Sequence, residues 1–522
     1  MMLLNNVCGE WIAGQGPGQP LFDPVLGTEL ARASTQGVDY GAALDYARQV
    51  GGANLRRLSF AERATLLNRI AEVLTAKRDS YYEIALANSG SPAADAAFDI
   101  DGAIYTLKYY AKAAKPLGDA HYLKDGDFVR LGKDESFQAL HLAAPLRGVA
   151  IHINAFNFPA WGLWEKAAPT LLSGVPIFAK PATSTAWLAQ RMVEDVANSG
   201  VLPAGALSIA CGSAGDLLDH VTGDDAVVFT GSAATAVHIR SHPAVVRNGA
   251  RLNIEADSLN SVLLGPDVKA GDPEFDLFIK EVAREMTLKA GQKCTAIRRI
   301  LVPAPLLTAV SEALIARLAK VSVGNPRNPS VKMGPLVSQA QQTAVQEGIA
   351  ALSRDAEVVF AGGPDFRLID ADPSVGAFVP PTLLICSKPL QSSLVHDEEV
   401  FGPVATLMAY DGLEQALDIA RLGKGSLVAS VFSGDDAFIE AALIGLAGSQ
   451  GRILAINREV GPSNTGHGNV MPMCLHGGPG RAGGGEELGG LRALRFYHRL
   501  SALQGPLKSL QALAQNAAEL RY

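Results

Sequence analysis

The sequence predicts an α/β protein with two parallel-sheet domains and a small β arm. The chain has 522 residues, of which 48% are hydrophobic, so it can fill more than one large core. Between about residues 145 and 265, short apolar runs alternate with amphipathic stretches, and this rhythm is typical of βαβ units. The same rhythm resumes after Phe278, which indicates a second domain of the same kind.

The region before this rhythm is predicted to be largely helical, with helices near residues 60–78 and 93–115. A polar segment at 121–144 follows, and it contains short stretches of strand-like alternation. The tail at 490–510 has a similar pattern. We expect these two distant segments to pair as the arm.

The alternating segment itself predicts four strands and two helices. In a parallel sheet, ligands bind beyond the carboxyl ends of the strands, so the loops that follow these strands are candidate binding loops. The expected strands are 148–153, 175–180, 206–211 and 226–230, and the expected helices are 161–172 and 184–198.

Composition and charge exclude several classes of protein. Lys and Arg number 45 against 52 Asp and Glu, a formal net charge of −7, and no basic run is interleaved with aromatic residues, so no nucleic-acid partner is expected. The N-terminus has no basic residue before Arg32, so no signal peptide is predicted. No apolar run approaches the roughly 20 residues that span a bilayer, so no membrane association is expected.

Five cysteines are scattered along the chain without a Cys-x-x-Cys pair. This pattern argues against a disulfide framework and against a metal site, and it favours a reducing cytoplasm. Cys211 and Cys386 each close an apolar run and are predicted core residues.

Cys294 stands apart, because Gly291-Gln292-Lys293-Cys294 places it between a helical segment and the strand-like run 296–302. A catalytic cysteine needs electropositive help to become a thiolate, and Lys293, Arg298 and backbone amides are the nearby sources. A lone cysteine is more often a small buried hydrophobic residue, so both interpretations stand at this point.

Two segments have the form of phosphate-binding loops. Residues 478–483 match Gly-x-Gly-x-x-Gly, but no strand precedes them and no βαβ unit follows, so we predict a mobile glycine-rich loop. At Phe229-Thr230-Gly231-Ser232 a strand ends and a helix begins. The amides of Gly231 and Ser232 are placed to bind an anion there, and the alternative is that Ser232 only caps the helix.

Six motifs occur in the order seen in the NAD(P)-dependent aldehyde dehydrogenase superfamily, which the chain resembles over nearly its whole length. The tail at 471–490 resembles a narrower branch, the semialdehyde dehydrogenases of aerobic aromatic degradation through coenzyme A thioesters, in the benzoate and phenylacetate pathways. The six motifs are Asn157-Phe158-Pro159, Phe178-Ala179-Lys180-Pro181, Phe229-Thr230-Gly231-Ser232, Gly291-Gln292-Lys293-Cys294, Met333-Gly334-Pro335-Leu336-Val337-Ser338 and Glu399-Val400-Phe401-Gly402-Pro403-Val404.

The resemblance implies an aldehyde dehydrogenase-like fold of two Rossmann-like domains and a β oligomerisation arm. Residues 1–120 and 145–260 would form the cofactor-binding domain, and residues 261–489 the catalytic domain that carries the cysteine. The arm of residues 121–144 and 490–510 would join two copies as a homodimer.

The resemblance also assigns chemistry to single residues. Cys294 matches the nucleophile, and Asn157 matches the asparagine that stabilises the oxyanion. The family's base is the glutamate of Glu-Leu-Gly-Gly-Lys, but here the stretch reads Leu252-Asn253-Ile254-Glu255-Ala256-Asp257-Ser258. Direct overlay puts Asn253 at the glutamate position, and Glu255 lies two residues on, which is the same side of a strand. We predict Glu255 as the base, with Asp257 and a purely structural role as alternatives.

Three further charged residues are candidates. Lys166 matches a family lysine near the active site, and Glu487 matches a glutamate implicated in water activation or proton relay, unless it is a solvated acidic turn. Glu165 is an unusual neighbour of Lys166. It would shuttle protons for Glu255 if it faces inward, and it would form a surface ion pair if it does not.

For the cofactor, Lys180 matches the lysine that contacts the adenosine ribose, and Glu399 matches the glutamate that holds the nicotinamide ribose. Thr183 is neutral where many NAD-preferring relatives carry a glutamate that would repel a 2′-phosphate. NADP is therefore the expected cofactor, with NAD accepted more weakly. The other expected cofactor contacts are Phe156, Gly231, Ser232 and Phe401.

The phenylacetate branch commonly carries a fused hydratase domain, and a chain ending at Tyr522 leaves no room for one. The expected substrate is therefore the 3,4-dehydroadipyl-CoA semialdehyde of the benzoate pathway. The alternatives are a phenylacetate-pathway coenzyme A semialdehyde, a coenzyme A-acylating reaction, or a binding protein without chemistry.

His467, His476 and Arg481 would meet the phosphates of coenzyme A, although such loop clusters are more often solvated.

Overall fold

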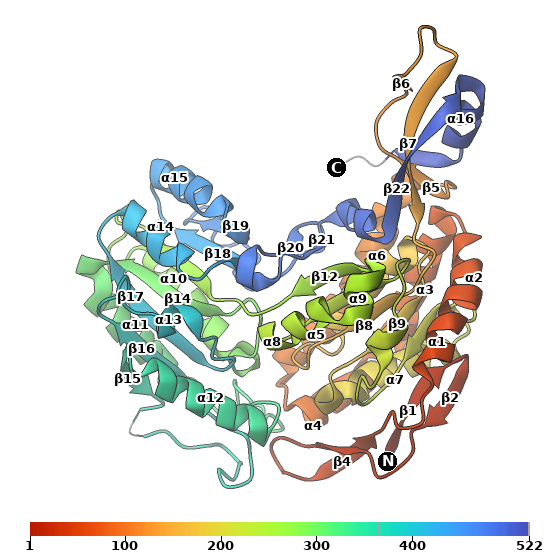
Figure 1. Cartoon of the computed structure of the whole chain (residues 1–522). Coiled ribbons are helices and arrows are strands. Elements are labelled where there is room, and N and C mark those ends of the chain that lie inside the picture. The colour runs from red at the N-terminus through yellow and green to blue at the C-terminus, as the bar shows by residue number, and fades with distance from the viewer. Residues whose placement is uncertain (364, 520–522) are drawn as a thin grey trace.

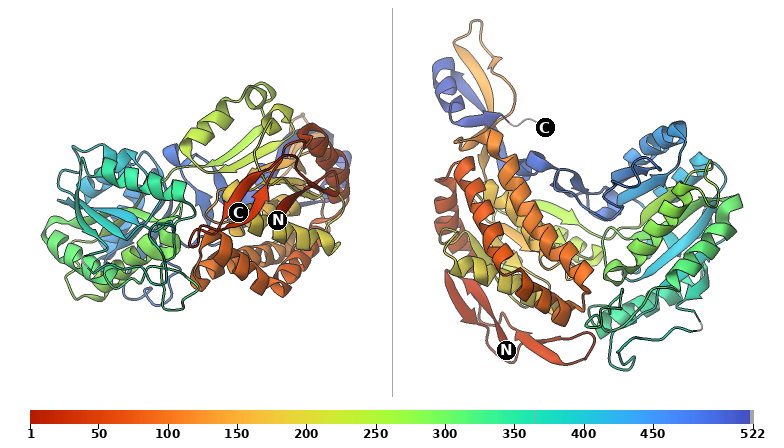
Figure 2. Two further views of the ribbon diagram at one scale, coloured as in Figure 1. Left: turned by 90° about the horizontal axis from the view of Figure 1, so that it is seen from below. Right: turned by 180° about the vertical axis from the view of Figure 1, so that it is seen from behind.

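The computed structural model describes residues 1–363 and 365–519 (Figure 1). Two large sheets, each flanked by helices, form the body of the molecule, and a smaller sheet projects from it as an arm (Figure 2). Parallel pairing dominates both large sheets, so the predicted α/β class with two parallel-sheet regions is confirmed.

The first large sheet has the strand order β12-β11-β8-β9-β10-β1-β4-β3, and β2 pairs with β1. Its central strands β12 to β10 run parallel. The strands are β1 (Met2–Val7), β2 (Glu10–Ala13), β3 (Gln19–Phe22), β4 (Glu29–Ala33), β8 (Ala150–Ile153), β9 (Ile177–Lys180), β10 (Leu207–Ile209), β11 (Ala226–Thr230) and β12 (Arg251–Glu255).

The helices around this sheet come from the first half of the chain. Alternate residues of β9 face two different cores, since Ile177 packs against the α3–α6 side and Phe178 against the opposite side. The helices are α1 (Tyr40–Tyr46), α2 (Gly52–Arg56), α3 (Phe60–Ala76), α4 (Arg78–Ser89), α5 (Ala93–Ala113), α6 (Trp161–Leu172), α7 (Ala186–Asn198), α8 (Ala233–Ser241) and α9 (Pro243–Asn248).

The second large sheet has the order β15-β16-β17-β14-β13-β18-β19, parallel except for β15. Its strands are buried on both faces, as Val262 and Leu263 show by facing opposite cores. The strands are β13 (Asn260–Leu264), β14 (Ile297–Pro303), β15 (Glu357–Ala361), β16 (Thr382–Cys386), β17 (Val404–Tyr410), β18 (Ser426–Phe432) and β19 (Gln450–Ile456). The helices are α10 (Pro273–Thr287), α11 (Leu307–Leu318), α12 (Gln339–Leu352), α13 (Leu394–Asp397), α14 (Leu413–Arg421) and α15 (Asp436–Ala447).

The arm joins two segments that are far apart in sequence. Strand β7 (Phe137–Pro145) pairs antiparallel with β22 (His498–Pro506) along its whole length, so the predicted pairing of these segments is confirmed. Figure 2 shows the arm pointing away from both large sheets. The arm also contains β5 (Tyr122–Lys124), β6 (Val129–Arg130), α16 (Leu507–Ala514) and β23 (Ala517–Glu519).

Local sequence explains most element boundaries. Helix α6 begins and ends where it was predicted. Helix α3 starts at a capping box formed by Ser59 and Glu62, but it ends at Ala76, and a second helix, α4, follows immediately. No glycine or proline marks this interruption of the helix at Lys77, so it was not predicted from the sequence.

A short antiparallel pair, β20 (Leu475–Gly477) and β21 (Glu486–Leu488), bridges the region between the two large sheets (Figure 1). The glycine-rich loop 478–485 connects these strands and hydrogen-bonds through its backbone to β12. The strand β20 precedes the loop, so the prediction that no strand does is wrong, but the loop leads back into an antiparallel pair and no βαβ unit follows, as expected. In the described part of the chain, no helix is long and apolar enough to cross a membrane.

Candidate active site

The turn before Cys294 has an unusual backbone. Lys289, Ala290 and Gly291 all adopt left-handed conformations, with φ of +52°, +51° and +69°. A side chain at Gly291 would lie 2.1 Å from the carbonyl oxygen of Gly402, so only glycine fits there. Left-handed non-glycine residues cost about 1–3 kcal/mol each and persist where the surroundings enforce them.

Three buried groups hold this turn. The Asp95 carboxylate on α5 accepts a hydrogen bond from the Lys289 amide at 2.9 Å. Arg298 donates to the Gly291 carbonyl at 2.8 Å, and Asn260 donates to the Cys294 carbonyl at 2.8 Å. These contacts fix Cys294 just before the start of β14.

Lys293 does not supply the positive charge that the sequence suggested. Its ammonium contacts both carboxylate oxygens of Glu285, at 2.8 and 2.7 Å, and both side chains are buried. Arg298 donates to backbone carbonyls, and its Nε lies 3.9 Å from the Glu399 carboxylate. The charges beside Cys294 are instead negative. Burial, followed by the carboxylates of Glu255, Glu165 and Glu399, raises the pKa of the Cys294 thiol well above its ordinary value.

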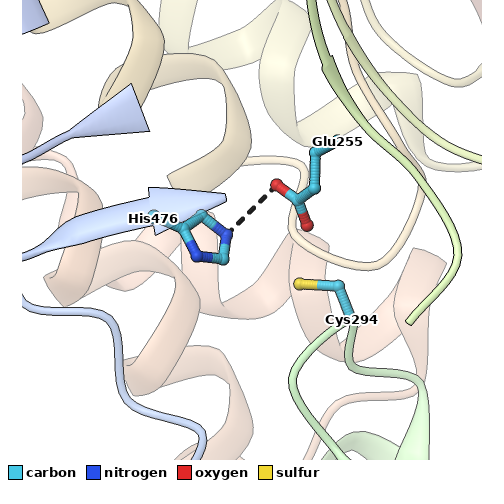
Figure 3. A group of neighbouring side chains, drawn as sticks. All are labelled: Glu255, Cys294 and His476. Carbon is cyan, nitrogen blue, oxygen red and sulfur yellow. Dashed lines mark ion pairs between the residues drawn. The ribbon is translucent and has the colours of Figure 1, made fainter. Parts of the chain in front are cut away.

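Glu255 lies at the carboxyl end of β12, opposite Cys294 (Figure 3). One carboxylate oxygen lies 3.1 Å from Nε2 of His476, and the other points toward the Cys294 sulfur. The reactive atoms of the three side chains lie within 4.8 Å of one another. Burial alone would raise the pKa of Glu255, but His476, Lys166 and the thiol outweigh burial and hold it at about 2.

Lys166 and two more carboxylates adjoin this group. The Lys166 ammonium lies 2.7 Å from Glu165 and 3.0 Å from Glu487, and all three side chains are buried. Asn253 donates to Glu487 at 3.3 Å, so Asn253 and Glu255 do face the same side of β12. Glu165 is therefore not in a surface ion pair, and Glu487 is not in a solvated turn.

This cluster has three carboxylates and one ammonium group, and the imbalance shifts the pKa values of its members. Burial raises the pKa of Glu165 well above its ordinary value, and Glu487 and Glu255 add to the effect. Burial also raises the pKa of Glu487. For Lys166, burial acts to lower the pKa, but the three carboxylates outweigh burial and raise it. The arrangement keeps the lysine charged and lets the carboxylates take up protons.

Asn157 follows β8 and lies near Cys294. Its side-chain amide donates to the Gln292 carbonyl at 3.1 Å, two residues before Cys294. Asn157, Glu165, Glu255 and Cys294 line one small cavity. The amide is therefore available to an oxygen that develops negative charge beside the sulfur.

Two larger cavities meet at Cys294. One, of about 330 Å³, is largely apolar and lies between α5 and the loop 468–471, with Phe98, Phe158 and Trp161 in its walls. The other, of about 560 Å³, lies beyond the carboxyl ends of β8, β9, β11 and β12. The sulfur is reached from both, so two different molecules can meet there.

Six of the seven predicted cofactor residues line the larger cavity. The rings of Phe156 and Phe401 meet edge to face with centroids 5.7 Å apart. Burial raises the pKa of Glu399 to about 8, and burial lowers the pKa of Lys180. The six lining residues are Phe156, Lys180, Gly231, Ser232, Glu399 and Phe401.

Thr183 is the exception, because its hydroxyl turns to the Gly212 carbonyl at 3.1 Å. At the start of α8, Ser232 is the N-cap and accepts from the Thr235 amide. Asp257 accepts a hydrogen bond from the Ala233 amide at 2.8 Å, so this alternative base faces α8.

His476 is the residue that sequence reasoning missed. It was grouped with solvated phosphate contacts, yet its side chain is fully buried and its ring meets Trp161 with centroids 5.8 Å apart. Arg481 is tied to backbone carbonyls of residues 396 and 397. No local sequence pattern indicated this position, because it depends on the pairing of β20 with β21, which sets His476 opposite Glu487.

Known proteins are similar to this chain over nearly its whole length. The 3,4-dehydroadipyl-CoA semialdehyde dehydrogenase of Aromatoleum evansii is 58% identical over 479 residues, 92% of this chain and 93% of that protein. A hydroxyisobutyraldehyde dehydrogenase of Mycolicibacterium austroafricanum is 28% identical over 95% of this chain and 92% of its own length.

The solved structure of betaine aldehyde dehydrogenase from Staphylococcus aureus in complex with NAD+ has a TM-score of 0.82 at 21% identity, covering 96% of this chain and 95% of that one. This match confirms the predicted fold. The model of the aldehyde dehydrogenase family matches residues 11–502. The chain belongs to the aldehyde dehydrogenase family and is an oxidoreductase.

Proposed function

We propose that this protein oxidises 3,4-dehydroadipyl-CoA semialdehyde to the carboxylic acid with reduction of NADP, in benzoate degradation. The observation that carries the proposal is the position of Cys294 where an apolar cavity and the strand-end cavity meet, beside Glu255 and Asn157. The substrate follows the relative that is 58% identical over nearly the whole chain.

The apolar cavity suits the acyl part of such a substrate. Its volume of about 330 Å³ takes an aliphatic chain with its aldehyde end at Cys294, while the nucleotide part of coenzyme A stays outside. The aromatic rings of Phe158 and Trp161 border the reacting end and limit the access of water.

In the first step, the Cys294 sulfur attacks the aldehyde carbon, and the carbonyl oxygen becomes an oxyanion in a thiohemiacetal. The Asn157 amide and the Cys294 backbone N–H donate to this oxygen. One such donor is worth about 3–4 kcal/mol at the transition state. The thiol proton leaves toward Glu255, whose free oxygen points at the sulfur.

The strand-end cavity fits a dinucleotide. Glu399 Oε1 is buried without a hydrogen-bond partner among the described residues, as expected of a group that receives a ribose hydroxyl. Lys180, Gly231 and Ser232 lie where ribose and phosphate groups are expected. A nicotinamide held there would supply a hydride acceptor, and loss of hydride from the thiohemiacetal carbon would leave the thioester on Cys294.

In the last step, Glu255 orients a water molecule toward the thioester and takes its proton, which frees the acid and restores Cys294. Glu165, Lys166 and Glu487 extend the charged cluster away from the sulfur and carry the proton onward. A free thiol of coenzyme A would instead give a new thioester. The buried carboxylates beside Cys294 favour water.

NADP is the proposed cofactor, with NAD used more weakly. The support is the neutral Thr183, which places no carboxylate near Lys180 to repel a 2′-phosphate. We further propose that the protein is cytoplasmic and forms a homodimer through the arm, where β7 and β22 project from the body.

The test compares kcat/KM for the coenzyme A semialdehyde with that for free medium-chain aldehydes, with NADP and with NAD. We expect the thioester and NADP to be preferred, with free acid as the product whether or not coenzyme A is added. Cys294→Ala should bind NADP and show no turnover. Equal kcat/KM for both aldehydes would refute the substrate, a large NAD preference would refute the cofactor, and acyl-CoA product would refute hydrolysis.

A further inference from the structure

His476 touches the Glu255 carboxylate and is the only histidine to do so among the described residues. It lies in β20, far along the chain from both Glu255 and Cys294. Its side chain is completely buried, and neither ring nitrogen makes a hydrogen bond of good geometry within the described structure. Burying an imidazole without such a partner costs free energy of folding, so its presence here calls for an explanation.

The geometry puts the carboxylate between the thiol and the imidazole. Figure 3 shows one Glu255 oxygen directed at His476 and the other toward the Cys294 sulfur. Trp161 packs on the imidazole with an angle of 60° between the rings and holds its orientation. A proton that leaves the sulfur therefore meets the carboxylate first and the imidazole next.

Beside His476, Glu255 is a poor store for that proton. Burial acts to raise the pKa of Glu255, but His476, followed by Lys166 and the thiol, lowers it to about 2, whereas burial and carboxylates raise the pKa of the thiol. The carboxylate passes a proton on more readily than it keeps one. Imidazole is the side chain suited to hold a proton near neutral pH, and it stands at the far oxygen.

We propose that His476 is a positioning residue for Glu255 and stores the proton that Cys294 releases. The S–H bond breaks as an O–H bond forms at the Glu255 oxygen that faces the sulfur. The protonated carboxyl group then turns about its Cγ–Cδ bond, the O–H bond breaks, and an N–H bond forms at Nε2 of His476. The products are a thiolate and an imidazolium on either side of an unchanged carboxylate, so atoms and charge balance. The inference rests on the proposed function only in taking Cys294 as the nucleophile.

Several other charged groups face this set and contribute to its titration. Glu487 lies opposite His476 in the β20–β21 pair, and Glu165 and Lys166 approach Glu255 from α6. Glu399 acts on Cys294 from the cofactor side. A pH profile therefore reports the whole set, and variants are needed to assign the part of His476.

The test measures alkylation of Cys294 by iodoacetamide without substrate, from about pH 6 to about pH 9, followed by mass spectrometry of the Cys294 peptide, since Cys8 and Cys474 are also exposed. The wild-type rate should stay nearly level across neutral pH. In His476→Gln we expect a rate at least about tenfold lower at pH 7 that climbs with pH, because the thiol must lose its proton to solvent.

Two further variants make the result specific. Glu255→Gln should give the same steep profile, and the double variant should be no slower than the slower single variant, because both break one relay. His498→Gln removes another buried imidazole, one that bonds to the Leu494 carbonyl at the base of the arm, and should leave the labelling of Cys294 unchanged. NADP binding and thermal unfolding check that each variant is folded.

A His476→Gln profile that matches the wild type within about twofold would overturn the proposal, as would additive losses in the double variant. Because labelling needs no turnover, it is independent of which aldehyde the enzyme prefers. If the coenzyme A semialdehyde proves a poor substrate while the labelling result holds, only the substrate assignment fails.

Discussion

Two buried lysines lie near Cys294, and their surroundings differ in charge balance. Lys293 faces one carboxylate, Glu285, and contacts both of its oxygens. Lys166 faces Glu165 and Glu487 directly and is close enough to Glu255 to influence it. The first pair is neutral, and the second group has more carboxylates than ammonium groups.

We interpret the Lys293–Glu285 pair as a structural ion pair, and we propose that the Lys166 group exchanges protons. In the Lys293–Glu285 pair, both carboxylate oxygens contact the ammonium group, so we do not expect this pair to exchange protons. The pair anchors the backbone beside Cys294. In the second group, Glu165 Oε2 and Glu255 Oε1 have no hydrogen-bond partner among the described residues. Raised pKa values at Glu165 and Glu487 let that group gain and lose protons at little cost.

The largest effect is expected on breaking the balanced pair. Lys293→Met leaves the Glu285 charge buried and unpaired, and this should lower the free energy of unfolding by about 3–5 kcal/mol. Chemical denaturation measures the loss. The double variant Lys293→Met, Glu285→Leu should recover most of it, and a single variant that loses under about 1 kcal/mol would remove the distinction.

Breaking the reactive group should act on the rate more than on stability. Lys166→Met removes the only ammonium that contacts Glu165 and Glu487 in the described structure, but these two carboxylates can take up protons instead of remaining charged. We expect kcat/KM to fall about 10- to 100-fold, with a smaller loss of stability than in Lys293→Met. Unfolding and steady-state kinetics on the same samples test this. An equal loss of stability in both variants would contradict it.

The smallest effect is a pH dependence of stability that belongs to Glu165. Its raised pKa means that the native state keeps a proton which the unfolded chain releases above about pH 4.3, so stability declines as pH rises. Glu165→Gln cannot titrate. Its free energy of unfolding, relative to the wild type, should therefore increase steadily from about pH 5 to about pH 9 in urea titrations. A flat or falling difference would show that Glu165 is ionised in the native state.

Much of the fold was predictable, because its signals are local. The helix over Trp161–Leu172 and the strand over Ala226–Thr230 occur as predicted. The arm was predicted from alternation in two segments, and β7 and β22 do pair. The short β20 and β21 were not predicted, because three-residue strands beside a glycine-rich loop have no periodicity to read.

The site was predictable only where a motif carried it. Cys294 and Asn157 were predicted from motif order, and Glu255 was predicted from strand alternation within a broken motif. The structure brings the three together. The role of Lys293 was misjudged because its partner, Glu285, lies on the preceding helix α10, and the turn at residues 289–291 folds the lysine back onto it. His476 was missed because its contact with Glu255 spans 221 residues (476 − 255), which no local pattern can reveal.

The strands β20 and β21 also set the order in which the enzyme becomes competent during synthesis. Cys294 leaves the ribosome 193 residues before Glu487 (487 − 294), and at 5–20 residues per second this interval is about 10–40 s. Throughout that time the nascent chain contains Cys294 without Glu487, and for all but the last 11 residues of it (487 − 476) the chain also lacks His476. Glu165, Lys166 and Glu255 are made before Cys294, so an incomplete chain lacks only His476 and Glu487 of the proposed proton-handling groups. That set is completed when the C-terminal segment docks.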